Sequence, residues 1–352
     1  MRILIDLSIL KNVHCGLGQV ALNYGYFFRD SYQPIAGEEI TLMVPKQFMG
    51  AFGDKVKYVR SWKIFRVLPW LIGAKYDVWH AIHQLSRYTP HACHYVLTIH
   101  DFNFVYEKEG RKVQEYLHKI QRKVNRADRI VAISQFAKAE TERFMEMKGK
   151  AVEVIYNGIE RIDLAREQAP ASVRAPFLFS IGEIKEKKNF HVLVDIMLRL
   201  PQYQLYIAGN KDTGYAQRIE QLIHEKNVTN MHLIGKVSAE EKVWLYRNCE
   251  AFVFPSLFEG FGLPVVEAML FRKPVICSHE TSLVEIGSKH VSFFEKGYPA
   301  EASAKLIRKA ITDTTPKQLD EAFAYATSFS WQAHVEAYLR LYRSLAGHDG
   351  RR

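Results

Sequence analysis

The sequence predicts an α/β fold with two Rossmann-like domains, each built on a doubly wound parallel sheet. Short apolar runs alternate with amphipathic stretches along most of the 352 residues, which is the pattern of strands separated by helices. A chain of this length usually needs more than one core. A charged stretch without apolar periodicity, at 160–176, separates the halves. We therefore expect domains at 1–170 and 171–328, followed by a C-terminal segment at 329–352.

The first domain opens with a strand, a glycine-bearing loop and a helix. Its short apolar runs predict strands at 2–7, 40–44, 78–81, 95–99, 129–133 and 152–155. Helical stretches lie between or after them, at 19–28 and 111–125. This alternation indicates a parallel sheet, whose ligands should bind beyond the carboxyl ends of the strands.

The second domain repeats this rhythm. Its predicted strands are 177–181, 204–208, 231–234, 251–254 and 273–277. Its predicted helices are 190–200, 215–226, 239–248 and a helix that starts at Pro264. A last amphipathic helix at 331–345 places five apolar side chains on one face: Val335, Tyr338, Leu339, Tyr342 and Leu345.

The composition indicates a globular protein with a basic surface. Hydrophobic residues make up 48% of the chain and no apolar stretch is long enough to cross a membrane, so we expect a cytoplasmic protein. The four cysteines form no C-x-x-C pair, which argues against disulfides and a zinc site. The net charge is +10, and residues 51–130 hold 15 Lys and Arg against 7 Asp and Glu. This excess favours an anionic membrane or acidic acceptor, or a solvated face without a partner; no nucleic-acid motif accompanies it.

The most informative stretch follows the strand at 251–254 and reads F-P-S-L-F-E-G-F-G-L-P-V-V-E-A-M. Because Pro264 fits the first position of a helix, the glycine-bearing loop should present its N–H groups at a helix N-terminus, where phosphate binds well. Glu259 and Glu267 flank this position. They are either ordinary acids of a helix start or ligands for the hydroxyl groups of a sugar.

This string resembles the E-x7-E signature of the retaining glycosyltransferases of family 4, or group 1, many of which act in bacterial envelope synthesis. The resemblance implies the GT-B fold, in which two Rossmann-like domains face a cleft and a C-terminal helix crosses back to the first. It also implies that Glu259 lies against the transferred sugar as a catalytic residue and that Glu267 binds the donor ribose. The donor-binding backbone would be that of Gly260, Phe261, Gly262 and Leu263.

A second anion cradle is predicted where a glycine, a lysine cluster and a helix start follow the strand at 177–181. In the family, the lysine before an asparagine contacts the donor phosphate, which implies this role, and a part in catalysis, for Lys188 after Gly182. Glu183 stands where many relatives have arginine, so we name Lys187 as the second cation. The resemblance also places the donor base near Val237.

Two features of the first domain complete the expected site. Gly16 and Gly18 formally match the G-x-G-x-x-A fingerprint of NAD-binding folds, but several residues separate them from the strand. The resemblance implies instead that this loop faces the donor phosphates. His100 lies just past the strand at 95–99, and the resemblance implies that it approaches the transferred sugar as a third catalytic residue.

One further segment mixes aromatic and basic side chains. Within 59–75, Trp62, Phe65 and Trp70 alternate with Arg and Lys, a composition typical of a membrane interface. The alternative is a helix that packs its apolar side on the sheet. We expect peripheral contact with the inner face of the membrane through this segment and the basic region 51–130.

The resemblance implies transfer of a hexose, with retention, from a UDP- or GDP-linked sugar to a saccharide or lipid-linked acceptor in polysaccharide or lipopolysaccharide synthesis. No cofactor is expected. The sequence contains no D-x-D motif, so we also expect no catalytic metal. The alternatives are a nucleotide-sugar epimerase or phosphorylase of the same fold, and an NAD-linked oxidoreductase.

Overall fold

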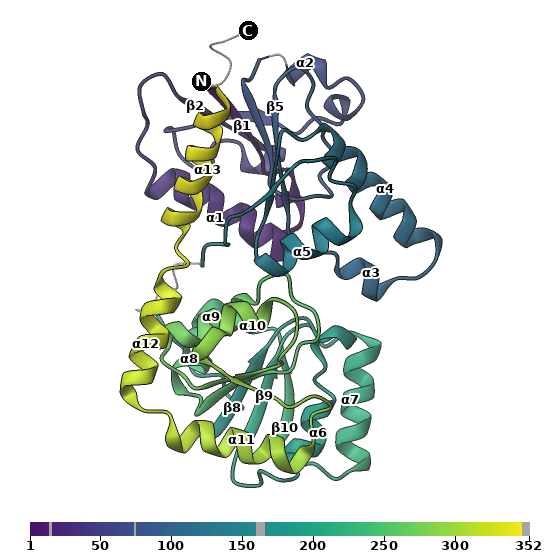
Figure 1. Ribbon diagram of the computed structural model, residues 1–352. Coiled ribbons are helices and arrows are strands. Elements are labelled where there is room, and N and C mark those ends of the chain that lie inside the picture. Colours follow the sequence, from purple (N-terminus) through teal and green to yellow (C-terminus); the bar gives the residue numbers. More distant parts are fainter. Residues whose placement is uncertain (14–15, 74, 160–165, 347–352) are drawn as a thin grey trace. The chain divides into compact units, whose positions relative to one another are not determined.

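The computed structural model describes residues 1–13, 16–73, 75–159 and 166–346, which form two compact units (Figure 1). The first unit comprises Met1–Glu160 together with Phe329–Arg352, and the second comprises Arg161–Ser328. Each unit is an α/β domain built on one parallel sheet, as the sequence predicts.

The second unit begins before residue 170, where the sequence analysis put the boundary. Glu167 Oε2 lies 2.7 Å from Arg247 Nη1, and the Gln168 N–H donates to the Glu240 carbonyl oxygen at 3.2 Å. Both partners lie in helix α8 (Ala239–Asn248) of the second unit. These contacts attach the end of the connecting stretch to the second unit.

The first unit contains a seven-stranded parallel sheet in the order β3-β2-β1-β4-β5-β6-β7. Its strands are β1 (Arg2–Asp6), β2 (Glu39–Val44), β3 (Lys57–Arg60), β4 (Val78–Ala81), β5 (His94–Ile99), β6 (Arg129–Ala132) and β7 (Val152–Val154). The chain runs outward from β1 to β3 and then crosses to β4 on the other side of β1. The carboxyl ends of β1 and β4 therefore form a topological switch point, the usual ligand position in such sheets.

The helices of this unit cover the sheet on both faces (Figure 1). They are α1 (Gly16–Asp30), α2 (Trp70–Gly73), α3 (Asn103–Glu107), α4 (Arg111–Arg126), α5 (Gln135–Phe144) and α13 (Trp331–Ala346), with short 3₁₀ turns η1 (Ser8–Asn12), η2 (Lys46–Phe48) and η3 (Lys63–Arg66).

The C-terminal helix α13 returns to the first unit, as predicted, and lies beside α1 (Figure 1). Its predicted apolar face is buried in the same cluster as the strands β1 and β2. Polar bonds add to this packing, because Tyr342 OH lies 2.6 Å from His80 Nδ1 and Tyr338 OH lies 2.7 Å from Thr98 Oγ1. The helix is thus fixed to the sheet through side chains of β4 and β5.

The second unit contains a six-stranded parallel sheet in the order β10-β9-β8-β11-β12-β13. Its strands are β8 (Phe177–Ile181), β9 (Gln204–Ala208), β10 (Met231–Gly235), β11 (Ala251–Phe254), β12 (Val275–Cys277) and β13 (Ser292–Phe293). Its other helical elements are η4 (Glu186–Lys188), α6 (Val192–Met197), α7 (Gly214–Glu225), α9 (Leu263–Leu270), α10 (Ser282–Gly287), η5 (Ser288–His290), α11 (Ala300–Asp313) and α12 (Pro316–Thr327). The switch point of this sheet lies between β8 and β11.

Several local predictions differ from the structure: for example, the helix predicted at 190–200 spans only Val192–Met197, and the one predicted at 19–28 spans Gly16–Asp30. The strand predicted at 273–277 starts only at Val275, because Arg272 has a φ of +53° and the Lys273 N–H donates to the Ala268 carbonyl oxygen in the turn that ends α9. The segment 59–75 is not one packed helix: it contains the end of β3, η3 and the four-residue α2, with several apolar side chains exposed. Within the described ranges, no helix is both long enough and apolar enough to cross a bilayer.

Candidate functional site

The loop from β11 to α9 ends in a backbone shape that requires glycine. Gly262 caps α9 with a φ of +98°, and a Cβ at this position would lie 2.4 Å from Leu283 Cδ2. Pro264 occupies the first turn of α9, as expected. In the described part of the chain, the N–H groups of Gly262 and Leu263 have no hydrogen-bond acceptor. These two donors and the helix dipole can therefore bind an anion.

Glu259 and Lys188 lie against each other beside this helix start. Glu259 Oε1 is 2.5 Å from Lys188 Nζ and accepts a hydrogen bond from Ser256 Oγ at 2.6 Å. Both charged side chains are largely buried, with 10% of Lys188 and 14% of Glu259 exposed. Lys188 reaches this position over Gly182, where a Cβ would lie 3.2 Å from Lys188 Cε. The loops after β8 and β11, far apart in the sequence, thus form one polar site.

Glu267 belongs to a second polar group. Its Oε1 lies 2.6 Å from Lys242 Nζ, and its Oε2 accepts a hydrogen bond from Tyr246 OH at 2.8 Å. Burial, followed by the charge of Glu267, raises the pKa of Tyr246 well above its ordinary value, so the phenol stays protonated and donates. The two glutamates therefore have different partners and can bind different parts of one ligand.

Sequence reasoning missed Lys242, Tyr246 and Ser256. Lys242 and Tyr246 are four residues apart on α8, the spacing at which helical side chains share a face. That spacing alone does not predict that the two side chains share a carboxylate partner. Ser256 stood within the quoted motif, yet only the folded loop shows that its hydroxyl bonds to Glu259.

His100 is buried at the end of β5 and bonds to the loop that follows β4. Its ring Nε2 lies 2.8 Å from the Ile82 carbonyl oxygen, and its backbone N–H donates to Gln84 Oε1 at 3.1 Å. Burial lowers its pKa to about 4, so the imidazole is neutral near pH 7. A neutral ring that donates from Nε2 keeps Nδ1 as an acceptor.

The glycine pair at the start of α1 has a packing explanation at one position. A Cβ on Gly18 would lie 2.0 Å from the Asn12 carbonyl oxygen, so glycine permits η1 to approach α1. Among the described residues, a Cβ on Gly16 would meet nothing within 4 Å. The insertion of η1 between β1 and α1 departs from the tight strand-to-helix turn of a dinucleotide-binding fold.

Two family models match adjacent parts of the chain. Residues 28–161 match the model described as Glycosyltransferase Family 4, and residues 162–328 match the model described as Glycosyl transferases group 1. The chain belongs to these glycosyltransferases. The second match coincides with nearly all of the second unit, which holds Lys188, Glu259 and Glu267.

Individual proteins agree with this membership. The chain is 30% identical over 253 residues to the serotype-specific mannosyltransferase WbdA of Escherichia coli, covering 65% of this chain and 31% of that protein. It is 28% identical over 174 residues to O-antigen chain mannosyltransferase B of E. coli, covering 47% and 45%. The chain thus spans about a third of the length of WbdA.

A solved structure of the Anabaena protein HepE in complex with UDP and glucose is similar in fold. Its TM-score is 0.73 at 19% identity, with 97% of this chain and 99% of that chain covered. This likeness supports the GT-B architecture.

The remaining residues that the sequence predicts for the donor site lie in loops of the second unit. The Lys187 carbonyl oxygen accepts the Leu257 N–H at 2.7 Å, so the backbone of Lys187 joins the two site loops. Val237 is half-buried in the turn between β10 and α8. Gly260 and Phe261 are buried within the loop before α9, while Glu183 pairs with Lys185 at 2.9 Å on the surface.

Proposed function

We propose that the chain is a retaining glycosyltransferase that moves a hexose from a UDP- or GDP-linked sugar to a saccharide or lipid-linked acceptor of the bacterial envelope. The observation that carries this proposal is the Lys188 and Glu259 pair beside the N-terminus of α9. A cation, free N–H groups and a carboxylate are the groups that a diphosphate and a sugar hydroxyl need. The relative named as an O-antigen chain mannosyltransferase supports the envelope as the place of synthesis.

The chemistry asks the site to stabilise a departing diphosphate. When the bond between the anomeric carbon and the diphosphate oxygen breaks, the electron pair leaves with the diphosphate. Lys188 has three N–H donors and uses one toward Glu259, so two can meet phosphate oxygens. The N–H groups of Gly262 and Leu263 add donors that need no rearrangement during the reaction. Glu259 would lie against the transferred hexose, and Glu267 would bind the ribose.

The cationic side chain and the helix start provide positive charge that many glycosyltransferases obtain from a metal. We infer that transfer proceeds without a divalent ion. Activity should therefore survive excess EDTA, and a loss that magnesium or manganese restores would contradict this.

The test of the function uses the purified full chain with UDP- and GDP-hexoses and a membrane extract that supplies acceptor. We expect acceptor-dependent release of UDP or GDP and a product whose anomeric configuration, measured by NMR, equals that of the donor. Inversion would refute the retaining assignment. Epimerisation of the donor without acceptor, or phosphate-dependent cleavage of a glycan, would favour the epimerase or the phosphorylase.

We also propose peripheral membrane contact through the exposed segment 62–71. In this segment Trp62 is 49% exposed, Val67 72% and Trp70 53%. Arg60 lies over the Trp62 ring at 3.9 Å, so an aromatic ring and a cation share one surface position. Aromatic and basic side chains together suit the interface of an anionic membrane.

A further inference from the structure

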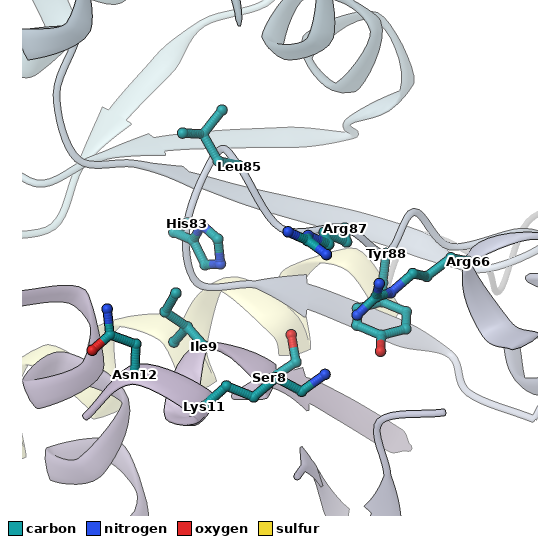
Figure 2. A pocket seen from close by; sticks show the side chains of 9 residues that line it. All are labelled: Ser8, Ile9, Lys11, Asn12, Arg66, His83, Leu85, Arg87 and Tyr88. Carbon is teal, nitrogen blue, oxygen red and sulfur yellow. The ribbon is translucent and has the colours of Figure 1, made fainter. Parts of the chain in front are cut away.

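A cavity of about 210 Å³ lies at the switch point of the first sheet, within the first unit (Figure 2). Its walls come from the residues after β1 and after β4, with one side chain from η3. The polar and charged residues on these walls include Ser8, Lys11, Arg66, His83, Arg87 and Tyr88. Since a water molecule occupies about 30 Å³, the cavity has room for a phosphate group.

Three cations meet at this cavity: Lys11, Arg66 and Arg87. Burial lowers the pKa of Lys11, and the charges of Arg66 and Arg87 lower it further. Among the described residues, no carboxylate lies within ion-pair distance of these three side chains. Buried Asp6 offsets part of the charge of Lys11, because its charge raises the pKa that the neighbouring cations lower. Like charges this close repel one another, so an anion bound here would relieve the remaining repulsion.

Buried donors without partners point to the same ligand. Arg66 Nε and His83 Nδ1 are buried, and neither has a hydrogen-bond partner within the part of the chain that the structure describes. Only 5% of His83 is exposed. Burial lowers the pKa of His83 to about 3, so its ring is neutral and can donate one N–H. Buried polar atoms normally have partners, and a bound anion would supply both.

Hydrogen bonds with buried Asp6 and Lys123 hold the loops that form the walls of the cavity. Buried Asp6 accepts the Ser8 N–H at 2.9 Å and the hydroxyl of Ser86, so one carboxylate ties the loop after β1 to the loop after β4. Lys123 Nζ donates to the Tyr88 carbonyl oxygen at 2.8 Å. The Arg66 guanidinium lies over the Tyr88 ring at 5.1 Å. These contacts hold the two loops and the Arg66 side chain in place before a ligand binds, which favours tight binding.

We propose that this cavity binds a phosphate group carried by the acceptor, an assignment that rests on the proposed glycosyltransferase function. Arginine offers paired donors that match phosphate oxygens. The donor diphosphate already has its own cradle in the second unit, at Lys188 and the start of α9. Arg66 also lies within the exposed apolar segment 62–71, so the phosphate could belong to a lipid as well as to a soluble saccharide.

The experiment titrates the full chain with inorganic phosphate, mannose 6-phosphate and geranyl phosphate by calorimetry, with mannose and geraniol as uncharged controls. We expect one shared site whose affinity falls roughly tenfold or more in Arg66→Gln and Arg87→Gln, because each loses a charge-assisted hydrogen bond. Arg66→Lys should keep only part of the phosphate affinity that Arg66→Gln loses, because lysine lacks the paired donors. Arg111→Gln, which changes a side chain 92% exposed, should bind as the unaltered chain does.

Comparison of the probes identifies the source of the phosphate. Tighter binding of geranyl phosphate than of inorganic phosphate indicates a lipid-linked acceptor, and tighter binding of mannose 6-phosphate indicates a phosphorylated saccharide. Undiminished phosphate binding in both pocket variants would overturn the proposal. The proposal would also be overturned if only Lys188→Gln lost phosphate binding, because the phosphate would then lie in the second unit.

Parallel titration with UDP and GDP separates this proposal from the proposed function. Nucleotide binding should persist in Arg66→Gln and Arg87→Gln. If those variants lose nucleotide and phosphate equally, the cavity belongs to the donor and the assignment fails. If no nucleotide binds any protein while phosphate still depends on Arg87, the anion pocket stands and the glycosyltransferase function falls.

Discussion

At the scale of single residues, Glu267 is fixed between Lys242 and Tyr246, which suits a carboxylate that binds both hydroxyls of a ribose. Glu267→Gln should therefore raise the KM for the donor roughly tenfold or more and change kcat little, since a hydrogen bond to a charged group contributes about 1.5–3 kcal/mol. Steady-state kinetics with varied donor measures this. Glu220→Gln, an exposed change on α7, is the control. Unchanged donor kinetics in Glu267→Gln would remove Glu267 from the site.

Glu259 should act on turnover instead. Its Oε1 is bonded to Lys188 and Ser256, so it is held rigidly beside the proposed leaving group. Glu259→Gln keeps the shape and removes the charge. We expect kcat and kcat/KM to fall together by roughly 10²–10³, the cost of one lost electrostatic contact in a transition state. A change in KM alone would mean that Glu259 only positions the donor.

At the scale of elements, the attachment of α13 to the first unit should be sensitive to acid. His334 is buried, and its ring nitrogens lie 2.8 Å from Tyr24 OH and 2.7 Å from the Tyr156 carbonyl oxygen. Burial lowers its pKa to about 4. Because the unfolded chain binds the proton at about pH 6.5, the stabilising contribution is present above that pH and is lost as pH falls toward 4.

The measurement is the melting temperature of the first unit between pH 7.5 and 4.5. Because the pKa of His334 is lowered from 6.5 to about 4, its protonation should reduce the free energy of unfolding by roughly 3 kcal/mol at most. His334→Gln can keep a donor and an acceptor but does not titrate, so its acid slope should be shallower. His224→Gln, an exposed change in the second unit, should leave that slope as it is. Equal slopes in all three proteins would contradict the assignment.

Elements were predictable where burial alone determines them. A strand buried on both faces of a parallel sheet is a mostly apolar run, and the sequence therefore predicts β4, β8 and β11 with the bounds that the structure has, although His80 interrupts the run of β4 and Ser180 that of β8. The two-residue β13 gives no such run.

The Lys188 and Glu259 pair joins residues far apart in sequence, so each could be named as a candidate but their contact could not. The anion pocket was missed for the same reason, since η1, η3 and the loop after β4 meet only in the folded unit.

At the scale of the whole molecule, each compact unit has its own sheet, its own switch point and its own group of cationic side chains for which we propose anion binding. The second unit holds the Lys188 cradle, and the first holds the cavity lined by Lys11, Arg66 and Arg87. Some of the basic residues behind the net charge of +10 therefore lie in these two groups. Arg66 and Arg87 belong to the excess of Lys and Arg within residues 51–130. Substitutions in one group should leave ligand binding at the other intact.

Membrane attachment belongs to this scale because it depends on surface charge as well as on the segment 62–71. Basic side chains near an anionic leaflet contribute about 1 kcal/mol each, and salt screens them. We expect the protein to sediment with phosphatidylglycerol-containing vesicles at low salt, to dissociate at about 0.5 M salt, and to ignore pure phosphatidylcholine vesicles. The double change Trp62→Ser and Trp70→Ser should weaken sedimentation without altering the melting temperature, because both rings are about half exposed.

Leu198→Ser is the matched control, since Leu198 is 44% exposed in the second unit. This variant should sediment like the unaltered protein if the segment 62–71, rather than general surface hydrophobicity, inserts at the interface. Protein that stays in the supernatant with both kinds of vesicle at low salt would refute membrane contact. A phosphate-bearing acceptor would then have to reach the cavity from solution, and mannose 6-phosphate would be expected to bind it more tightly than geranyl phosphate.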